Sequence, residues 1–156
     1  MNVALGVVSK KSREITDLSQ FKDDDYMIII SGTTAEPYMI ENYKNIKLRK
    51  FDTYANAKNA YENGEGIAWI NDNTEVMAYA IENTDSVVGI PSLGSNDTIA
   101  PAVTKGNETL LNYINDLMKE LGKENFFHKD YEETLIDIYG KEYEETLVVE
   151  AKLVCY

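Results

Sequence analysis

The sequence has little of what several classes of protein require. Cys155 is the only cysteine in 156 residues, which excludes a disulfide framework within the chain and a metal site built on cysteines. His128 is the only histidine, and without a second histidine or a cysteine nearby it predicts a surface or packing role, not a metal site. No apolar run approaches the ~20 residues that span a bilayer. The N-terminal "MNVALGVVSKK" lacks the charged-then-apolar layout of a signal peptide, so we expect no signal sequence within this chain.

Positive charge is also scarce. Fifteen basic residues face twenty-seven acidic ones, and the formal net charge of -12 would repel phosphate backbones, so no nucleic-acid partner is expected. Neither GxGxxG nor GxxxxGK[ST] is present, and we expect no cofactor. The dense acidic run at 23–25 lacks the alternating spacing of a calcium loop and predicts a solvated turn.

Short strand-like runs alternate with helical patterns in the first hundred residues. Helices are predicted at about 34–43, 53–63 and 73–83, each opened by Thr or Asn. Strands are predicted at 2–9, 26–30, 45–51, 66–70, 86–90 and 98–104. Several of these runs are almost continuously apolar, which is typical of parallel strands covered by helices on both faces. The sequence therefore predicts an α/β domain with a small, mostly parallel sheet.

The pattern changes after residue 105. Two amphipathic helices are predicted, at 107–121 and 126–138, and each needs a surface for its apolar stripe. The tail at 141–156 ends in a further strand-like run whose partner the sequence does not identify. We therefore divide the chain into a domain at 1–105, helices at 106–140 and the tail.

The stretch "IIISGTTAEPY" at 28–38 predicts a strand, a sharp turn and a helix start. Thr33 and Glu36 have the spacing of a capping box, and Pro37 fits only the first turn of a helix. Gly32 permits the turn, and the N–H groups of Thr33 and Thr34 would face an anion at the positive end of the helix dipole. A small carboxylate suits such a site, and helix capping alone is the alternative.

A second candidate follows the strand in "GIAWINDNTEVMAYA". Asp72 lies at the same predicted edge of the sheet and could hold an ammonium group, although Asp72 or Asn73 could equally cap the next helix. Together with the turn at Gly32, Thr33 and Thr34, it would complement a zwitterionic amino acid. Trp69 in this strand is expected to belong to the core, with ligand contact as the alternative.

These segments and their order resemble the bacterial extracellular solute-binding proteins of family 3, the polar amino-acid-binding proteins of ABC importers. The segment at 18–43 is similar to the family's strand and GTTxE turn, and 51–83 is similar to its next helix, strand and acidic residue. The segment at 99–140 resembles its closing strand, Lys-Gly-Asn turn and terminal helices. The sequence of this last segment is most similar to that of the cysteine-binding branch.

The resemblance implies a periplasmic-binding-protein-like (type II) lobe that binds a small polar amino acid such as cysteine. Thr33 and Thr34 would hold its α-carboxylate, Gly32 would shape the turn and Asp72 would hold its α-ammonium group. The strands at 3–9 and 98–104 would form the hinge between lobes. The family also implies an extracytoplasmic location, a membrane permease as partner and no catalysis.

The resemblance covers lobe two and the helices that normally cap lobe one, whereas lobe one itself has no counterpart here. The exposed stripes at 107–121 and 126–138 therefore predict a homodimer or a strand-swapped oligomer. Two other readings remain open: a dehydratase-type enzyme on the same fold, which needs a positioned acid or base, and a truncated domain that only folds and associates. No His, Cys or Lys is expected near either candidate loop.

Overall fold

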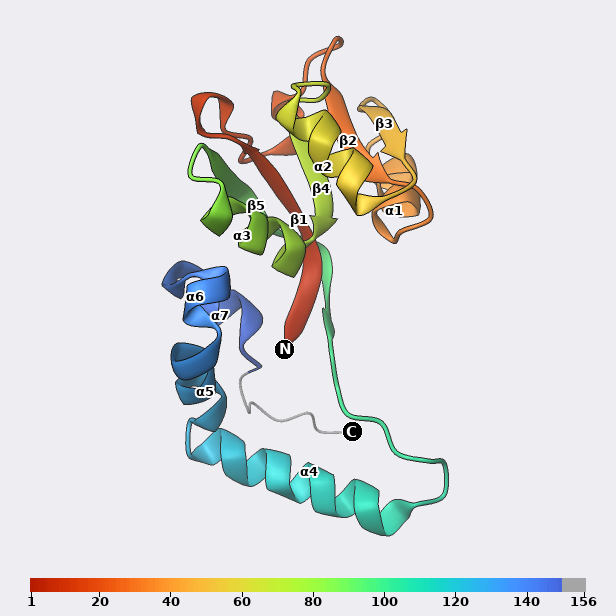
Figure 1. Ribbon diagram of the computed structural model, residues 1–156. Coiled ribbons are helices and arrows are strands. Elements are labelled where there is room, and N and C mark those ends of the chain that lie inside the picture. Colours follow the sequence, from red (N-terminus) through yellow and green to blue (C-terminus); the bar gives the residue numbers. More distant parts are fainter. Residues whose placement is uncertain (150–156) are drawn as a thin grey trace. The chain divides into compact units, whose positions relative to one another are not determined.

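The computed structural model describes residues 1–149 and forms two compact units, one at Val3–Asn96 and one made of residues 1–2 with the chain from Asp97 onward (Figure 1). The strands are β1 (Asn2–Lys10), β2 (Tyr26–Ile30), β3 (Lys47–Phe51), β4 (Ala68–Asp72) and β5 (Ser86–Thr98). The helices are α1 (Ala35–Asn42), α2 (Tyr54–Glu62), α3 (Asn73–Glu82), α4 (Glu108–Lys123), α5 (Phe126–Thr134), α6 (Ile136–Tyr139) and α7 (Glu144–Leu147). No helix in this described part combines the length and apolarity needed to cross a membrane.

A five-stranded sheet in the order β3-β2-β4-β1-β5 organises the first unit. β2 runs parallel to both β3 and β4, whereas β1 pairs antiparallel with β4. β5 begins beside the end of β1, because the N–H of Lys11 donates to the carbonyl of Asp85 at 2.8 Å. The α/β class with a small sheet is therefore confirmed, and the sheet is mixed, parallel from β3 through β2 to β4 and antiparallel between β4 and β1.

Alternating side chains bury both faces of the central strands. On one face, Met27 and Ile29 of β2 join a core cluster with Ala35 and Met39, so α1 covers this face. On the other face, Trp69 of β4 contacts aromatic rings from α2 and α3. Coverage on both sides explains why the sequence of these strands is almost continuously apolar.

The strand predicted at 98–104 is wrong. β5 continues to Thr98, and residues 99–104 contain no strand, so the long β5 replaces the separate strand predicted at 98–104. In the tail, residues 141–147 form helical turns, and the strand-like run predicted at the end of the tail extends into 150–156, outside the described residues. The hinge role of the first and last strands stays a prediction.

The acidic run at 23–25 is only partly a solvated turn. The guanidinium of Arg13 donates to both carboxylate oxygens of Asp25, at 2.9 and 2.6 Å, and the N–H of Lys22 donates to the same carboxylate at 2.7 Å. The hydrogen bond from Arg13 is the main reason that the pKa of Asp25 is lowered. Asp25 is buried because the fold brings Arg13 to it, which the local acidic pattern could not reveal.

The second unit contains the helices predicted after residue 105, with one division. The stretch predicted as one helix at 126–138 is split at Leu135 into α5 and α6. Tyr131 of α5 is buried, and its hydroxyl donates to the carbonyl of Gly140 at 2.7 Å. α4 differs from the other long helices, since none of its residues is buried.

Candidate functional site

A four-residue turn, 31–34, connects β2 to α1. The N–H of Ser31 donates to the carbonyl of Phe51 at 2.8 Å, which ties the start of the turn to the end of β3. Gly32 has a φ of 77°, in the left-handed region where a side chain is strained, so the glycine is what allows the chain to reverse here. α1 then begins at Ala35, with Thr34 as its N-cap residue.

The predicted capping box between Thr33 and Glu36 is absent. The hydroxyl of Thr33 donates to the carbonyl of Ile30 at 2.8 Å instead of accepting from the helix. Glu36 reaches further back than a capping box does, because its Oε2 accepts the N–H of Gly32 at 2.8 Å. Its Oε1 accepts from the ammonium group of Lys50 at 2.7 Å. Glu36, with Lys50, therefore ties the start of α1 back to the turn, and the hydroxyl of Thr33 bonds within the turn instead of capping the helix.

This closure leaves two backbone donors available. Within residues 1–149, neither the N–H of Thr33 nor that of Thr34 donates to an acceptor in the chain. Both groups precede the first residue of α1, where the helix dipole is positive. Thr34 is exposed and Thr33 is half-buried, so these N–H groups can donate hydrogen bonds to an anion from solvent without breaking a bond in the protein.

Asp72 ends β4 and immediately precedes α3. Its side chain is exposed, makes no capping hydrogen bond and has no ion-pair partner among the residues that the structure describes. Asn73 is the structural residue of the pair, because its Oδ1 accepts the N–H groups of Ala4 at 3.2 Å and Thr74 at 2.9 Å. Asp72 was predicted either to cap α3 or to bind an ammonium group, and the structure does not support the capping role.

Strand register brings Asp72 beside the turn. Ile28 of β2 is level with Trp69 of β4, and continuing this parallel register places Ser31 level with Asp72. Neighbouring strands lie about 4.8 Å apart. Free N–H donors and a free carboxylate thus lie at the carboxyl end of adjacent parallel strands, the usual ligand edge of open α/β sheets.

A second aspartate flanks the turn from the other side. Ile30 of β2 is level with Phe51 of β3, so the next residues, Ser31 and Asp52, come side by side. Asp52 is exposed, as Asp72 is. Sequence analysis missed Asp52 because the order of the strands, with β2 between β3 and β4, cannot be deduced from their spacing along the chain. The two aspartates form a natural pair for comparison.

Glu36 and Lys50 are also residues that the sequence did not identify. The hydrogen bond from Lys50, and then the one from the N–H of Gly32, lower the pKa of Glu36, so it carries a negative charge next to the anion donors. Lys50 supplies the matching positive charge. The expectation that no lysine lies near either candidate loop is therefore wrong, because β3 carries Lys50 to the turn although it is 14 residues from Glu36 in sequence.

Trp69 belongs to the core. Its side chain is 0% exposed, so it cannot contact a ligand at the surface of the sheet edge. Three tyrosine rings surround the indole, with centroid distances of 5.1, 6.2 and 5.5 Å to Tyr54, Tyr61 and Tyr79. The indole N–H has no acceptor in the described structure. The core interpretation is confirmed.

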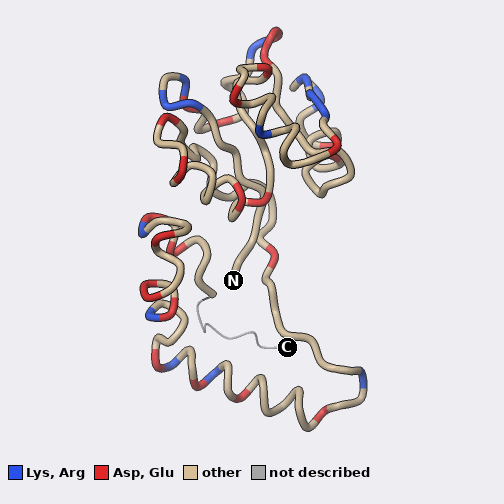
Figure 2. Tube along the Cα trace, in the orientation of Figure 1, with Lys and Arg blue, Asp and Glu red and all other residues tan. Residues whose placement is uncertain are grey.

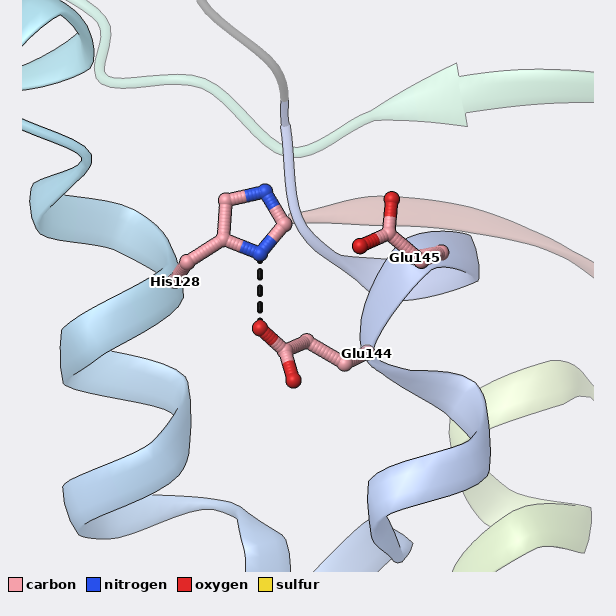
Figure 3. Close-up of side chains that lie close together, drawn as sticks. All are labelled: His128, Glu144 and Glu145. Atoms are coloured by element: carbon pink, nitrogen blue, oxygen red, sulfur yellow. Dashed lines mark hydrogen bonds and ion pairs between the residues drawn. The ribbon is translucent and has the colours of Figure 1, made fainter.

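His128 lies in the second unit and joins an ion-pair network (Figure 3). Its Nδ1 is 2.7 Å from Oε1 of Glu144, and candidate ligand atoms of His128, Glu144 and Glu145 lie within 4.8 Å of one another. Lys141 also donates to Glu144, at 2.6 Å. Hydrogen bonds from Lys141 and then from His128 lower the pKa of Glu144. The carboxylate of Glu144 is therefore already bonded to His128 and Lys141, which supports a packing role for His128.

Comparison with known proteins identifies related solved structures, whereas no family model and no curated protein matches the chain. The solute receptor for L-cysteine of Neisseria gonorrhoeae is 39% identical, with a TM-score of 0.71 over 96% of this chain and 61% of the receptor. The cysteine-binding protein of Campylobacter jejuni is also 39% identical, with a TM-score of 0.72 over 96% of this chain and 60% of that protein.

A more distantly related solved structure is described as the precursor of an enzyme. An ancestral amino-acid-binding protein, described as a precursor of cyclohexadienyl dehydratase, is 26% identical with a TM-score of 0.61 over 85% of this chain and 58% of its own. In each comparison this chain spans about three fifths of the related protein.

Proposed function

The chain belongs to family 3 of the bacterial extracellular solute-binding proteins, and we propose that it is the amino-acid-binding lobe of a receptor that serves an ABC importer. The observation that carries this proposal is the pairing of two free N–H groups, at Thr33 and Thr34, with the unpartnered carboxylate of Asp72 on one edge of the sheet. The N–H groups would bind the α-carboxylate of the ligand and Asp72 its α-ammonium group. Gly32 would give the turn its shape.

Cysteine is the ligand that we propose first, among small polar amino acids. The support is the 39% identity to two proteins whose names state that they bind cysteine. The groups at the sheet edge recognise only the two charged ends that all amino acids share. Selectivity for the side chain would therefore come largely from residues beyond this lobe.

The chain spans 61% and 60% of these two receptors, which suggests that a second lobe normally completes the site. Loss of one partner of a charge pair in a binding site costs about 2–5 kcal/mol, so this lobe alone would bind roughly 30- to 5,000-fold more weakly than a complete receptor. Closure of two lobes around the ligand would present a surface to a membrane permease. This role implies an extracytoplasmic location.

An enzyme on the same fold is the second candidate, since a dehydratase precursor is among the related proteins. Dehydration needs an acid or base with a suitably tuned pKa. At this edge Lys50 and Glu36 neutralise one another, and the pKa of Glu36 is lowered, which is the wrong direction for a general acid near neutral pH. Binding without catalysis therefore fits better, and turnover of cyclic keto or hydroxy acids would favour the enzyme.

The function is tested by removing the charged ends of the ligand one at a time. NMR titration of the purified chain with L-cysteine, cysteamine and 3-mercaptopropionate, under reducing conditions, compares the zwitterion with analogues that keep only one charge. A hydrogen bond to a charged group contributes about 1.5–3 kcal/mol, so each analogue should bind at least about tenfold more weakly than L-cysteine. Equal binding of all three, or none up to tens of millimolar, would contradict the proposal.

Self-association through α4 is a further expectation. Apolar side chains of this helix are 39% exposed or more at Leu110, Leu111, Tyr113 and Leu117. Exposed apolar patches drive association, so light scattering at micromolar concentration should give a mass above that of the monomer. Serine at both Leu110 and Leu117 should restore the monomer, whereas serine at Asn112 and Lys119, on the opposite side of α4, should not. A monomeric wild-type chain would count against association.

A further inference from the structure

Glu36 uses its two carboxylate oxygens for two different bonds. Oε2 accepts the N–H of Gly32 at 2.8 Å and Oε1 accepts from Lys50 at 2.7 Å. Lys50 is placed by the sheet, independently of this ion pair, because the N–H of Ser31 donates to the carbonyl of Phe51, the next residue of β3. Figure 2 shows basic residues gathered on β3, although acidic residues outnumber basic ones in the chain.

We propose that Glu36 and Lys50 act as a positioning pair for the ligand carboxylate. The inference rests on the proposed function and adds two residues to it. Glu36 occupies the N–H of Gly32, the second of the turn, and holds the glycine in its left-handed conformation. The next two N–H groups, at Thr33 and Thr34, are thereby kept in place and left for the ligand.

Lys50 neutralises the negative charge that Glu36 places beside the N–H donors. A carboxylate bonded to Gly32 lies next to the very donors that must attract a second carboxylate, and juxtaposed like charges repel strongly. The ammonium group of Lys50 cancels that charge. Of the cations on β3, Lys47 and Arg49 pair instead with Asp24 and Glu65. Lys50 is therefore the one in β3 whose charge is directed at the turn.

The ion pair between Glu36 and Lys50 should contribute little to the stability of the fold. The side chain of Lys50 is 44% exposed and that of Glu36 is 23% exposed. Ion pairs this close to solvent contribute little to the stability of a fold. Removing the charges should therefore leave the chain folded, which allows an effect on binding to be separated from an effect on folding.

The test is a charge cycle with Lys50→Met, Glu36→Gln and the double variant, each titrated with L-cysteine and with cysteamine by NMR. Lys50→Met leaves Glu36 unneutralised and should weaken L-cysteine binding at least ~5-fold through like-charge repulsion. Glu36→Gln keeps an oxygen for the N–H of Gly32 but leaves the ammonium group of Lys50 unpaired beside the donors, so it should bind L-cysteine more tightly than wild type. The double variant has neither charge and should bind L-cysteine more tightly than Lys50→Met and less tightly than Glu36→Gln.

Two controls separate charge at the turn from general effects. Lys44→Met removes the same charge at an exposed position without a partner in the described structure and should leave binding unchanged. Cysteamine, which has no carboxylate to be repelled, should bind Lys50→Met no more weakly than it binds wild type. The Gly32 amide signal in the free variants reports whether the turn is intact.

The outcomes are distinguishable. The inference is overturned if Lys50→Met binds L-cysteine as the Lys44→Met control does, or if the double variant binds as weakly as Lys50→Met. A wild-type chain that binds no amino acid overturns the proposed function and the inference together. Wild-type binding with an unaffected Lys50→Met variant overturns the inference alone.

Discussion

Asp72→Asn is expected to abolish measurable amino-acid binding while leaving the fold intact. Removing one partner of a charge pair in a binding site costs about 2–5 kcal/mol, and at an exposed position the lower value, roughly 30-fold in affinity, is the reasonable expectation. Because we expect a single lobe to bind weakly, such a loss should move binding beyond the range of a titration. The fold should not change, since the carboxylate of Asp72 has no hydrogen-bond or ion-pair partner in the described structure.

Asp52→Asn is the matched control. Asp52 has the same side chain and the same exposure, and it flanks the 31–34 turn from β3 as Asp72 flanks it from β4. Both substitutions change the net charge equally, so a general electrostatic effect would weaken both variants alike. Selective loss in Asp72→Asn is the predicted result of the NMR titration. Selective loss in Asp52→Asn would mean that the ammonium site lies on the other side of the turn.

Trp69→Ala is expected to have the largest effect on stability. The indole is fully buried in β4 and contacts tyrosine rings from α2 and α3, so its removal leaves a large cavity between the sheet and both helices. Such a truncation costs about 3–5 kcal/mol, a large part of the 5–15 kcal/mol that stabilises a typical domain. Urea denaturation followed by far-ultraviolet circular dichroism measures the loss without relying on tryptophan fluorescence.

Trp69→Phe distinguishes ring packing from the indole N–H. Phenylalanine keeps an aromatic ring against the tyrosines and removes a buried N–H that has no acceptor in the described part of the chain. An unsatisfied buried donor is itself unfavourable, so this variant should lose clearly less stability than Trp69→Ala. A loss below about 1 kcal/mol in Trp69→Ala would show that the cluster is not the core of this lobe.

The parts of the fold that sequence analysis predicted are those fixed by local chemistry. The apolar runs of β2 and β4 and the polar residues at the starts of α2 and α3 identified each element within a few residues. The strand predicted at 98–104 was wrong because pairing, which a local pattern does not contain, extends β5 to Thr98. The antiparallel direction of β1 against β4 likewise depends on the order of the strands.

In the candidate site too, sequence analysis found the residues that local sequence identifies and missed those that the order of the strands brings in. Gly32, Thr33, Thr34 and Asp72 were found because each stands where a strand ends and a helix begins, which is visible in sequence. The capping box expected from Thr33 and Glu36 was wrong, since Glu36 bonds Gly32 and Lys50 instead. Lys50 and Asp52 come from β3, and only the sheet order places that strand next to the turn. The binding roles of all these residues stay predictions.

The measurement that tests the central claim most directly is a ¹H–¹⁵N map of the wild-type chain titrated with L-cysteine. The account predicts saturable shifts at the amides of Gly32, Thr33, Thr34 and Asp72, with the largest at the two threonines whose N–H groups have no acceptor in the described structure. Unchanged amides at these positions up to tens of millimolar, or saturable shifts elsewhere only, would contradict it.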